Sequence, residues 1–313
     1  MSFLADIYRN FDAHFADENA SMVSFPKCTD VGSIIFIGES GCGKYSILGQ
    51  ILEKFRITPG ANRREPEAQK AEFHNVMFRI PIIDFTPGVN SEICDSDIEM
   101  CKMLIMIIDI TKAIPIDVIQ CVQGLLESVS PAPVLSVFLH KIDLVDPENV
   151  NNVIQLYKTN IMKDLPEAQF FTTSTLDGSS IFAVSNCIES VLPKKVQLKE
   201  AMDTFSRSLE LSSVFLIDCM TKTMFLSGGT YPNRELLSLC QDGVEMFISI
   251  TSMMDARGSQ TITSIELSDN LFYHYFWSAY DIILAGISEH KLPIATAKNN
   301  TTALLHTIKK FLK

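Results

Sequence analysis

A glycine-rich loop is the stretch of this sequence best suited to chemistry. Residues Gly38 to Lys44 fit the phosphate-binding spacing G-x-x-x-x-G-K. The glycines let backbone N–H groups curl around a phosphate, the lysine reaches the outer phosphates, and the following helix adds its positive dipole end. The apolar run Ile34 to Ile37 predicts a buried strand before the loop, and apolar residues at helical spacing predict a helix after it: Ile47, Leu48, Ile51, Leu52 and Phe55. This context favours a nucleotide site over a glycine turn that merely precedes a core helix.

The residue after Lys44 does not suit a nucleotide site that uses magnesium. The motif has Ser or Thr there, because that hydroxyl ligates Mg²⁺ beside the phosphates. Tyr45 stands in its place and carries its oxygen at the end of a long, rigid ring. Ser46 comes one residue late, and one residue turns a helix by about 100°. The sequence therefore predicts a damaged metal site beside an intact phosphate cradle, which consists of Gly38, Ser40, Gly41, Cys42, Gly43, Lys44, Tyr45 and Ser46.

A second polar motif, His140-Lys141-Ile142-Asp143, follows a predicted buried strand from Val134 to Leu139. A carboxylate at this point can accept hydrogen bonds from the N1–H and the exocyclic amine of guanine together, a donor pair that adenine lacks. The stem of Lys141 is expected to lie along the base. A Lys–Asp pair after a strand is often only a solvated turn, but its place after a P-loop strand favours guanine. Ser174 and Thr175 would complete the base pocket through backbone contacts, with a polar turn as the alternative.

The segment Asp84 to Gly88 stands where a D-x-x-G element would hold the water of Mg²⁺ and the γ-phosphate. The spacing is one residue too long, and Pro87, which has no N–H to donate, occupies the register expected for glycine. Val89 follows Gly88, so no glutamine is placed to orient a hydrolytic water. Asp84 is therefore the one candidate metal residue, acting through water. We assign no catalytic residue and expect slow GTP hydrolysis at most.

The composition excludes several classes of protein. A length of 313 residues favours two domains, and 47% hydrophobic residues with a mean hydropathy of +0.18 exclude a largely disordered chain. No apolar run is long enough to span a bilayer, and we expect no secretory signal. The net charge of −11 argues against general binding to nucleic acid or anionic membranes. The scattered cysteines are typical of reduced cytosolic thiols: Cys28, Cys42, Cys94, Cys101, Cys121, Cys187, Cys219 and Cys240.

Strands that alternate with helices follow the P-loop helix as far as Val191. Strands are predicted over Val76–Asp84, Met103–Asp109, Val134–Leu139 and Gln169–Thr173, and helices over Val118–Leu126, Pro147–Met162 and Ile181–Val191, with a loop over Thr58–Lys70. This alternation predicts an α/β fold with a doubly wound, mostly parallel sheet. Its ligand is expected at the carboxyl ends of the strands, where the polar motifs fall.

The pattern changes after Pro193-Lys194-Lys195, which marks a domain boundary. Paired strands are predicted over Val214–Asp218 and Thr223–Leu226, further strands over Thr261–Leu267, Phe272–Trp277 and Ile282–Ile287, and helices over Leu236–Phe247 and Thr302–Leu312. This grouping predicts a small α+β interaction domain with an antiparallel sheet. The chain thus divides into an N-terminal amphipathic helical segment (residues 1–30), a P-loop nucleotide-binding domain (31–193) and a C-terminal domain (194–313).

Together these motifs resemble those of the Rag GTPases, Ras-related proteins that form obligate heterodimers in nutrient signalling. The resemblance covers nearly the whole chain: the P-loop, Ile57-Thr58-Pro59, Asp84-Phe85 with Pro87-Gly88, His140-Lys141-Ile142-Asp143, Thr173-Ser174 with Asp177, Ser180-Ile181-Phe182, Phe215-Leu216-Ile217-Asp218 and Phe225-Leu226. Most GTP-binding proteins have Asn at the position of His140, whereas His is usual there in the Rag family. Two parts of the chain are more similar to the C/D branch of the family: Asp84-Phe85 with Pro87-Gly88, and the segment that starts at Phe215. The segment from His140 to Val145 is more similar to the A/B branch.

The resemblance implies a P-loop GTPase domain followed by a roadblock domain, with GDP or GTP as ligand. It implies an A/B-type Rag partner bound through the C-terminal domain, a TORC1-like kinase complex, and an anchoring complex that holds the cytoplasmic dimer at the lysosome or vacuole without direct membrane insertion. The chain departs from the family at Tyr45, at Asn62 in the place of a switch threonine, in a shorter switch region, and in lacking the switch glutamine.

Three interpretations of the site stay open at this point. The chain could hold nucleotide poorly, hold it without switching, or have an empty pocket. The first hypothesis is a regulatory Rag-type subunit, and the second is a pseudo-GTPase that serves only as a structural subunit of a dimer. An ATP-dependent P-loop enzyme is disfavoured because it leaves Asp143 unexplained.

Overall fold

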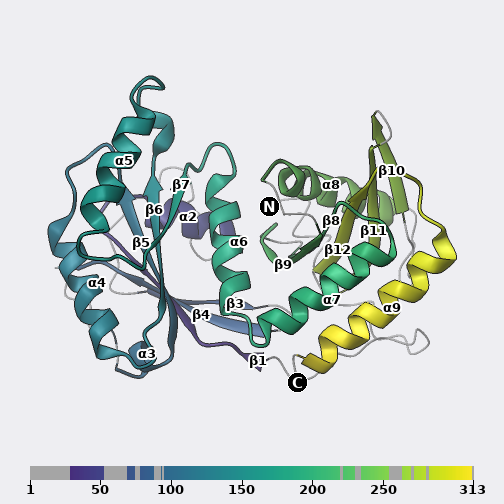
Figure 1. Cartoon of the computed structure of the whole chain (residues 1–313), viewed down its shortest axis with the longest axis horizontal. Coiled ribbons are helices and arrows are strands. Elements are labelled where there is room, and N and C mark those ends of the chain that lie inside the picture. Colours follow the sequence, from purple (N-terminus) through teal and green to yellow (C-terminus); the bar gives the residue numbers. More distant parts are fainter. Residues whose placement is uncertain are drawn as a thin grey trace.

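The computed structural model describes residues 29–52, 69–74, 78–87, 93, 95–218, 221–229, 234–253, 263–268, 271–279 and 282–311. These residues form two lobes, each built on its own β-sheet (Figure 1). The predicted N-terminal helix lies outside the described residues, as do Phe55, Asn62, Gly88 and Val89.

The first lobe holds a mixed sheet in the strand order β1-β4-β2-β5-β6-β7, with β3 paired to β4. All of its pairings are parallel except that of β3 with β4. The strands are β1 (Thr29–Asp30), β2 (Ser33–Ile37), β3 (Gln69–His74), β4 (Phe78–Phe85), β5 (Cys101–Asp109), β6 (Val134–His140) and β7 (Gln169–Thr173). The doubly wound, mostly parallel sheet predicted from the sequence is confirmed.

Helices cover both faces of this sheet (Figure 1). Apolar side chains of α2 (Lys44–Ile51) and α6 (Ser179–Val191) pack on one face, and those of α4 (Ile116–Ser128) and α5 (Val150–Ile161) pack on the other. A short helix, α3 (Asp95–Glu99), precedes β5. The central strands are buried on both faces, which explains why β2, β5 and β6 are continuous apolar runs.

Strand β3 was not expected, since its first two residues lie at the end of the predicted loop Thr58–Lys70. It pairs antiparallel with β4 along its whole length. Where its side chains are described, burial alternates: Phe73 is buried, whereas Glu72 is exposed and paired to Arg79. Such alternation is typical of a strand with one face in water, but six residues give too short a signal beside the polar segment that precedes them.

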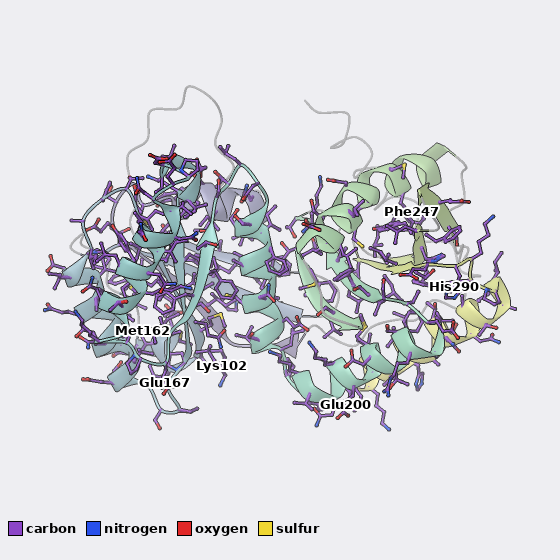
Figure 2. All side chains as sticks on the ribbon, turned by 45° about the horizontal axis from the view of Figure 1, so that its top comes forward. Lys102, Met162, Glu167, Glu200, Phe247 and His290 are labelled. Atoms are coloured by element: carbon purple, nitrogen blue, oxygen red, sulfur yellow. The ribbon has the colours of Figure 1, made fainter. Side chains whose placement is uncertain are left out.

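The second lobe is an antiparallel sheet in the order β10-β11-β12-β8-β9. Its strands are β8 (Ser213–Asp218), β9 (Met224–Gly229), β10 (Thr263–Ser268), β11 (Leu271–Ala279) and β12 (Ile282–Ser288). Helix α8 (Arg234–Met253) packs on one face; Figure 2 shows Phe247 between this helix and the strands, where its ring stacks on Tyr275 with centroids 4.3 Å apart. Helices α7 (Lys195–Ser208) and α9 (Ile294–Phe311) cover the other face. The predicted antiparallel α+β unit is confirmed.

Two helices of this lobe differ from the sequence prediction. Helix α7 begins at Lys195, inside the stretch taken as a boundary, and α9 begins at Ile294 rather than Thr302. The apolar stripe of α7 is narrow and consists of Leu198, Met202 and Phe205. A mostly polar helix with so few apolar positions resembles a linker in sequence, although those three side chains are buried.

Helix α6 joins the two lobes by contacting β9, the end strand of the second sheet. The Ser185 hydroxyl accepts a hydrogen bond from the Met224 N–H at 3.0 Å. The Glu189 carboxylate, which is buried, accepts one from the Ser227 hydroxyl, whose oxygen lies 3.1 and 3.2 Å from its two oxygens. An end strand presents unpaired N–H groups, so these side chains both satisfy that edge and hold the lobes together.

Replacing Glu189 with alanine is expected to lower the free energy of unfolding by about 2 kcal/mol, because the Ser227 hydroxyl would be left buried without its acceptor. Urea unfolding of the whole chain measures this change. The control is Glu200→Ala on the outer side of α7, where Figure 2 shows Glu200, with an expected effect within about 0.5 kcal/mol. Equal losses in the two variants would contradict a junction held by Glu189.

Among the described residues, no helix combines the length and apolar character needed to cross a bilayer.

Candidate nucleotide-binding site

The polar motifs of the first lobe meet at one edge of its sheet, where the parallel strands reach their carboxyl ends. The P-loop follows β2, and Asp84 stands near the end of β4 opposite Phe36. Strand pairing sets Asp109 beside His140 and His140 beside Thr173. Strands that run the same way end at the same edge, so residues far apart in sequence are brought together here.

The P-loop has the backbone that a phosphate cradle needs. Gly41 and Gly43 have φ angles of +72° and +108°, a region that side chains rarely adopt. The ammonium of Lys44 is buried and donates to the carbonyl oxygens of Gly38 at 2.6 Å and Glu39 at 3.1 Å. These bonds fix a positive charge inside the curve of the loop, next to the N-terminus of α2.

Cys42 lies in the same loop but offers no reactive thiol. It is 2% exposed, and burial raises the pKa of its thiol despite the nearby charge of Lys44. Cys42 therefore packs as a small apolar residue.

The ring of His140 lies directly against the P-loop. A Cβ on Gly43 would fall 2.3 Å from His140 Cδ2 and 2.6 Å from its Nε2. His140 Nδ1 is 3.0 Å from the Thr173 hydroxyl oxygen, and burial lowers the pKa of the imidazole, which favours its neutral form. The His140 ring therefore packs against the P-loop at Gly43, and its contact with Thr173 links β6 with β7.

Lys141 links the second motif to the P-loop. Its backbone has a φ of +66°, and its ammonium donates to the Gly41 carbonyl at 2.8 Å and to Asp109 Oδ2 at 2.5 Å. The reasoning from sequence missed Asp109 as a site residue. The available signal was an acidic residue at the end of a buried strand, at the edge where the other motifs fall.

The third part of the site is the loop between β7 and α6. The Ser179 hydroxyl lies 2.7 Å from the Ser174 N–H and 2.5 Å from Asp177 Oδ1. Gln50 of α2 donates to the Thr175 carbonyl at 3.0 Å, which ties the loop to the P-loop helix. The predicted base-pocket residues Ser174 and Thr175 are thus held by their backbone groups, and Gln50 and Ser179 are supporting residues that the sequence did not single out.

Asp143 lies in a one-turn 3₁₀ helix, η2 (Ile142–Leu144), and is exposed. Its carboxylate is open to a ligand approaching from solvent. The neighbouring Lys141 instead reaches the P-loop, where its ammonium donates to the Gly41 carbonyl.

The residues that would stand beside a metal ion are Tyr45, Ser46 and Asp84. The ring of Tyr45 is partly buried and packs against the apolar core, and Ser46 is half-buried one position further along α2. Asp84 is 3% exposed. Within the part of the chain that the structure describes, no group of three or more His, Cys, Asp or Glu residues could hold a metal ion. Among the described residues, neither Ser nor Thr stands directly after Lys44, so these residues do not fit Mg²⁺ in the way the motif binds it.

Solved structures that resemble parts of this chain include a small GTPase. Arl6 (BBS3) from Trypanosoma brucei, with bound nucleotide analogue GppNp, is 14% identical and gives a TM-score of 0.40, covering 52% of this chain and 98% of its own. A point variant of Era from Aquifex aeolicus, bound to GDP and AlF₄⁻, is 19% identical with a TM-score of 0.40, covering 60% and 71%. MglB from Myxococcus xanthus is 12% identical with a TM-score of 0.31, covering 37% and 86%. A comparison with curated proteins gives no match.

A family model settles which proteins this chain is related to. The model described as the Gtr1/RagA G protein conserved region matches residues 33–234, which is more than half of the chain. The match begins at β2, includes the whole P-loop and His140 to Asp143, and ends at the start of α8. The first lobe is a P-loop GTPase domain, and the second is the antiparallel α+β domain that follows it. The chain therefore belongs to the Gtr1/RagA family of G proteins, the Rag-type GTPases.

Proposed function

We propose that this chain is a Rag-type guanine-nucleotide-binding subunit of a heterodimer that regulates TORC1-like nutrient signalling. The observation that carries the nucleotide part is the bond from Lys141 to the Gly41 carbonyl, which joins the base motif to the phosphate loop. Asp143 would read the N1–H and amine of guanine, Lys141 would lie along the base, and the loop from Gly38 to Lys44 would cradle the phosphates.

The nucleotide would be held with little help from a metal ion. Tyr45 replaces the hydroxyl ligand and turns its ring to the apolar core. Since the residues present do not fit Mg²⁺, the phosphates would depend on Lys44 and backbone N–H groups. Hydrolysis would be slow, because catalysis in this fold depends on electrostatic positioning by the metal and switch residues.

Replacing Tyr45 with serine should restore a metal response. A hydroxyl would then stand directly after Lys44, so we expect Mg²⁺ to slow GDP dissociation from Tyr45→Ser by about tenfold, a difference of about 1.4 kcal/mol. Dissociation of a fluorescent GDP is timed in Mg²⁺ and in EDTA. Tyr45→Phe keeps the ring and is the control, with the small response of the unmodified chain. A tenfold response in the unmodified chain would show that Tyr45 does not disable the metal site.

The partners follow from family membership and are proposed on that basis. The C-terminal domain would pair with an A/B-type Rag, and the dimer would recruit a TORC1-like complex to a lysosomal or vacuolar surface through a separate anchoring complex. Co-expression of the full chain with an A/B-type Rag, followed by size-exclusion chromatography, tests the pairing. Co-elution at one-to-one stoichiometry is expected, and elution of two separate monomers would overturn it.

A structural dimer subunit without a nucleotide cycle is the second candidate. It is favoured by Tyr45 and by Pro87, which has no N–H for a γ-phosphate. If the pocket is permanently empty, Tyr45→Ser changes nothing, so the same dissociation assay separates the two candidates.

A further inference from the structure

The carboxylate of Asp109 is fully engaged where β5 ends. Its side chain is 2% exposed, whereas that of Lys141 is 27% exposed. Oδ2 accepts from the Lys141 ammonium, and Oδ1 accepts from the Thr111 N–H at 3.0 Å and from its hydroxyl at 2.6 Å. Three donors from two loops therefore hold the carboxylate in one orientation.

The charge of Asp109 is matched to this arrangement. Burial alone would raise its pKa, but the hydrogen bonds from Lys141 and Thr111 prevail and lower the pKa of the carboxyl group. Asp109 is therefore ionised at neutral pH and neutralises Lys141. A neutral pair adds little net charge beside the phosphate loop.

Lys141 needs such an anchor. Its φ of +66° is a conformation that costs a non-glycine residue roughly 1–2 kcal/mol, and a free lysine has many rotamers to lose. The Lys141 ammonium donates to both the Asp109 carboxylate and the Gly41 carbonyl, and these two hydrogen bonds fix its position. The stem is then fixed before any ligand arrives.

We propose that Asp109 is a positioning residue of the guanine-nucleotide site, which holds Lys141 between the base motif and the phosphate loop. This inference rests on the proposed function and adds a residue to it. Asp109 touches no ligand; it acts by pre-organising Lys141, which lowers the ordering cost that nucleotide binding has to meet. Its loss should speed the release of GDP and GTP alike, because both share the base and the loop.

A purely electrostatic role of Asp109 predicts the opposite result. Removing a negative charge leaves Lys141 unneutralised, which should strengthen the binding of any polyanion. Lys112 would add to this effect, since its ammonium lies 3.9 Å from where a Cβ on Gly41 would stand. The direction of the change in the GDP dissociation rate therefore separates the two roles: faster release supports positioning, and slower release supports electrostatics. Inorganic tripolyphosphate has the charge without the base, so its affinity shows whether the substitution has damaged the phosphate loop itself.

The test compares Asp109→Asn, Lys141→Met and the double variant in the full chain, with Asp164→Asn as control because Asp164 is an exposed aspartate of the same domain. We expect Asp109→Asn and Lys141→Met each to raise the GDP dissociation rate about tenfold, and the double variant to be no faster than the faster single one. Tripolyphosphate binding should not weaken in Asp109→Asn, and Asp164→Asn should match the unmodified chain.

Three outcomes would overturn the proposal: an unchanged GDP dissociation rate in Asp109→Asn, multiplicative effects in the double variant, or an equal loss of tripolyphosphate binding. If Asp109→Asn does not fold, Asp109→Glu keeps the charge and displaces the carboxylate by one methylene, and a rate between those of Lys141→Met and the unmodified chain is expected. If the unmodified chain binds no guanine nucleotide, the proposed function fails as well. Binding with unchanged rates in the variants overturns the role of Asp109 alone.

Discussion

Replacing Gly43 with alanine is expected to abolish nucleotide binding, with a loss of affinity of at least about 100-fold. The φ of +108° at this position strains any residue with a Cβ. The new methyl group would also fall 2.3 Å from His140 Cδ2, closer than real Cβ atoms approach any neighbour. Because His140 is buried and tied to Thr173, the P-loop rather than the ring should be displaced.

Titration of a fluorescent GDP into Gly43→Ala measures this loss. The matched control is Gly124→Ala on α4, where a Cβ meets nothing within 4 Å and alanine is the better helix former. Gly124→Ala should bind nucleotide normally and unfold at the same or a slightly higher temperature. Unchanged affinity in Gly43→Ala would mean that the close contact with His140 does not shape the phosphate site.

Replacing Asp143 with asparagine should transfer specificity from guanine to xanthine nucleotides, with GDP affinity falling about 100-fold. In the proposed site the aspartate would accept from the N1–H and the amine of guanine. An asparagine amide accepts from N1–H but donates at the second position, where guanine also presents a donor and xanthine presents a carbonyl. Asp143 is exposed and can meet either base.

Competition of GDP, XDP and ADP for a fluorescent nucleotide gives the specificity directly. Asp146→Asn, an exposed aspartate of the same loop, is the control and should keep the guanine preference. If Asp143→Asn and the unmodified chain show equal preference for GDP, Asp143 does not read the base. A preference for ADP in the unmodified chain would favour an ATP-dependent enzyme.

The sequence predicts the parts of this site that need a particular residue type at a fixed spacing. Gly41, Gly43 and Lys44 are constrained by backbone conformation and by charge, and both constraints are visible in the sequence. The buried strands can also be predicted from the sequence, since a strand covered on both faces must be a continuous apolar run. The structure confirms these strands, and it gives the two glycines the positive φ angles that a phosphate loop needs.

Residues that act through long-range contacts could not be found in this way. Asp109 and Lys141 are separated by 32 positions, and Gln50 and Ser180 by 130. The position of Asp109 at the end of a buried strand shows that it lies at the ligand edge, but the sequence does not show its pairing with Lys141 or that of Gln50 with Ser180, because these partners are set by the fold. The junction between the lobes is similar, since Glu189 looks like one more surface glutamate of a helix until β9 is placed beside it.

The most direct test of a guanine-nucleotide site with little need for metal is to denature the purified protein and identify any released nucleotide by chromatography. Fluorescent GDP and GTP are then titrated in Mg²⁺ and in EDTA. Released GDP or GTP, with affinities that differ by less than about threefold between the two conditions, is the predicted result. No released nucleotide and no binding at high micromolar ligand would contradict it, and would leave a structural dimer subunit as the better account of this chain.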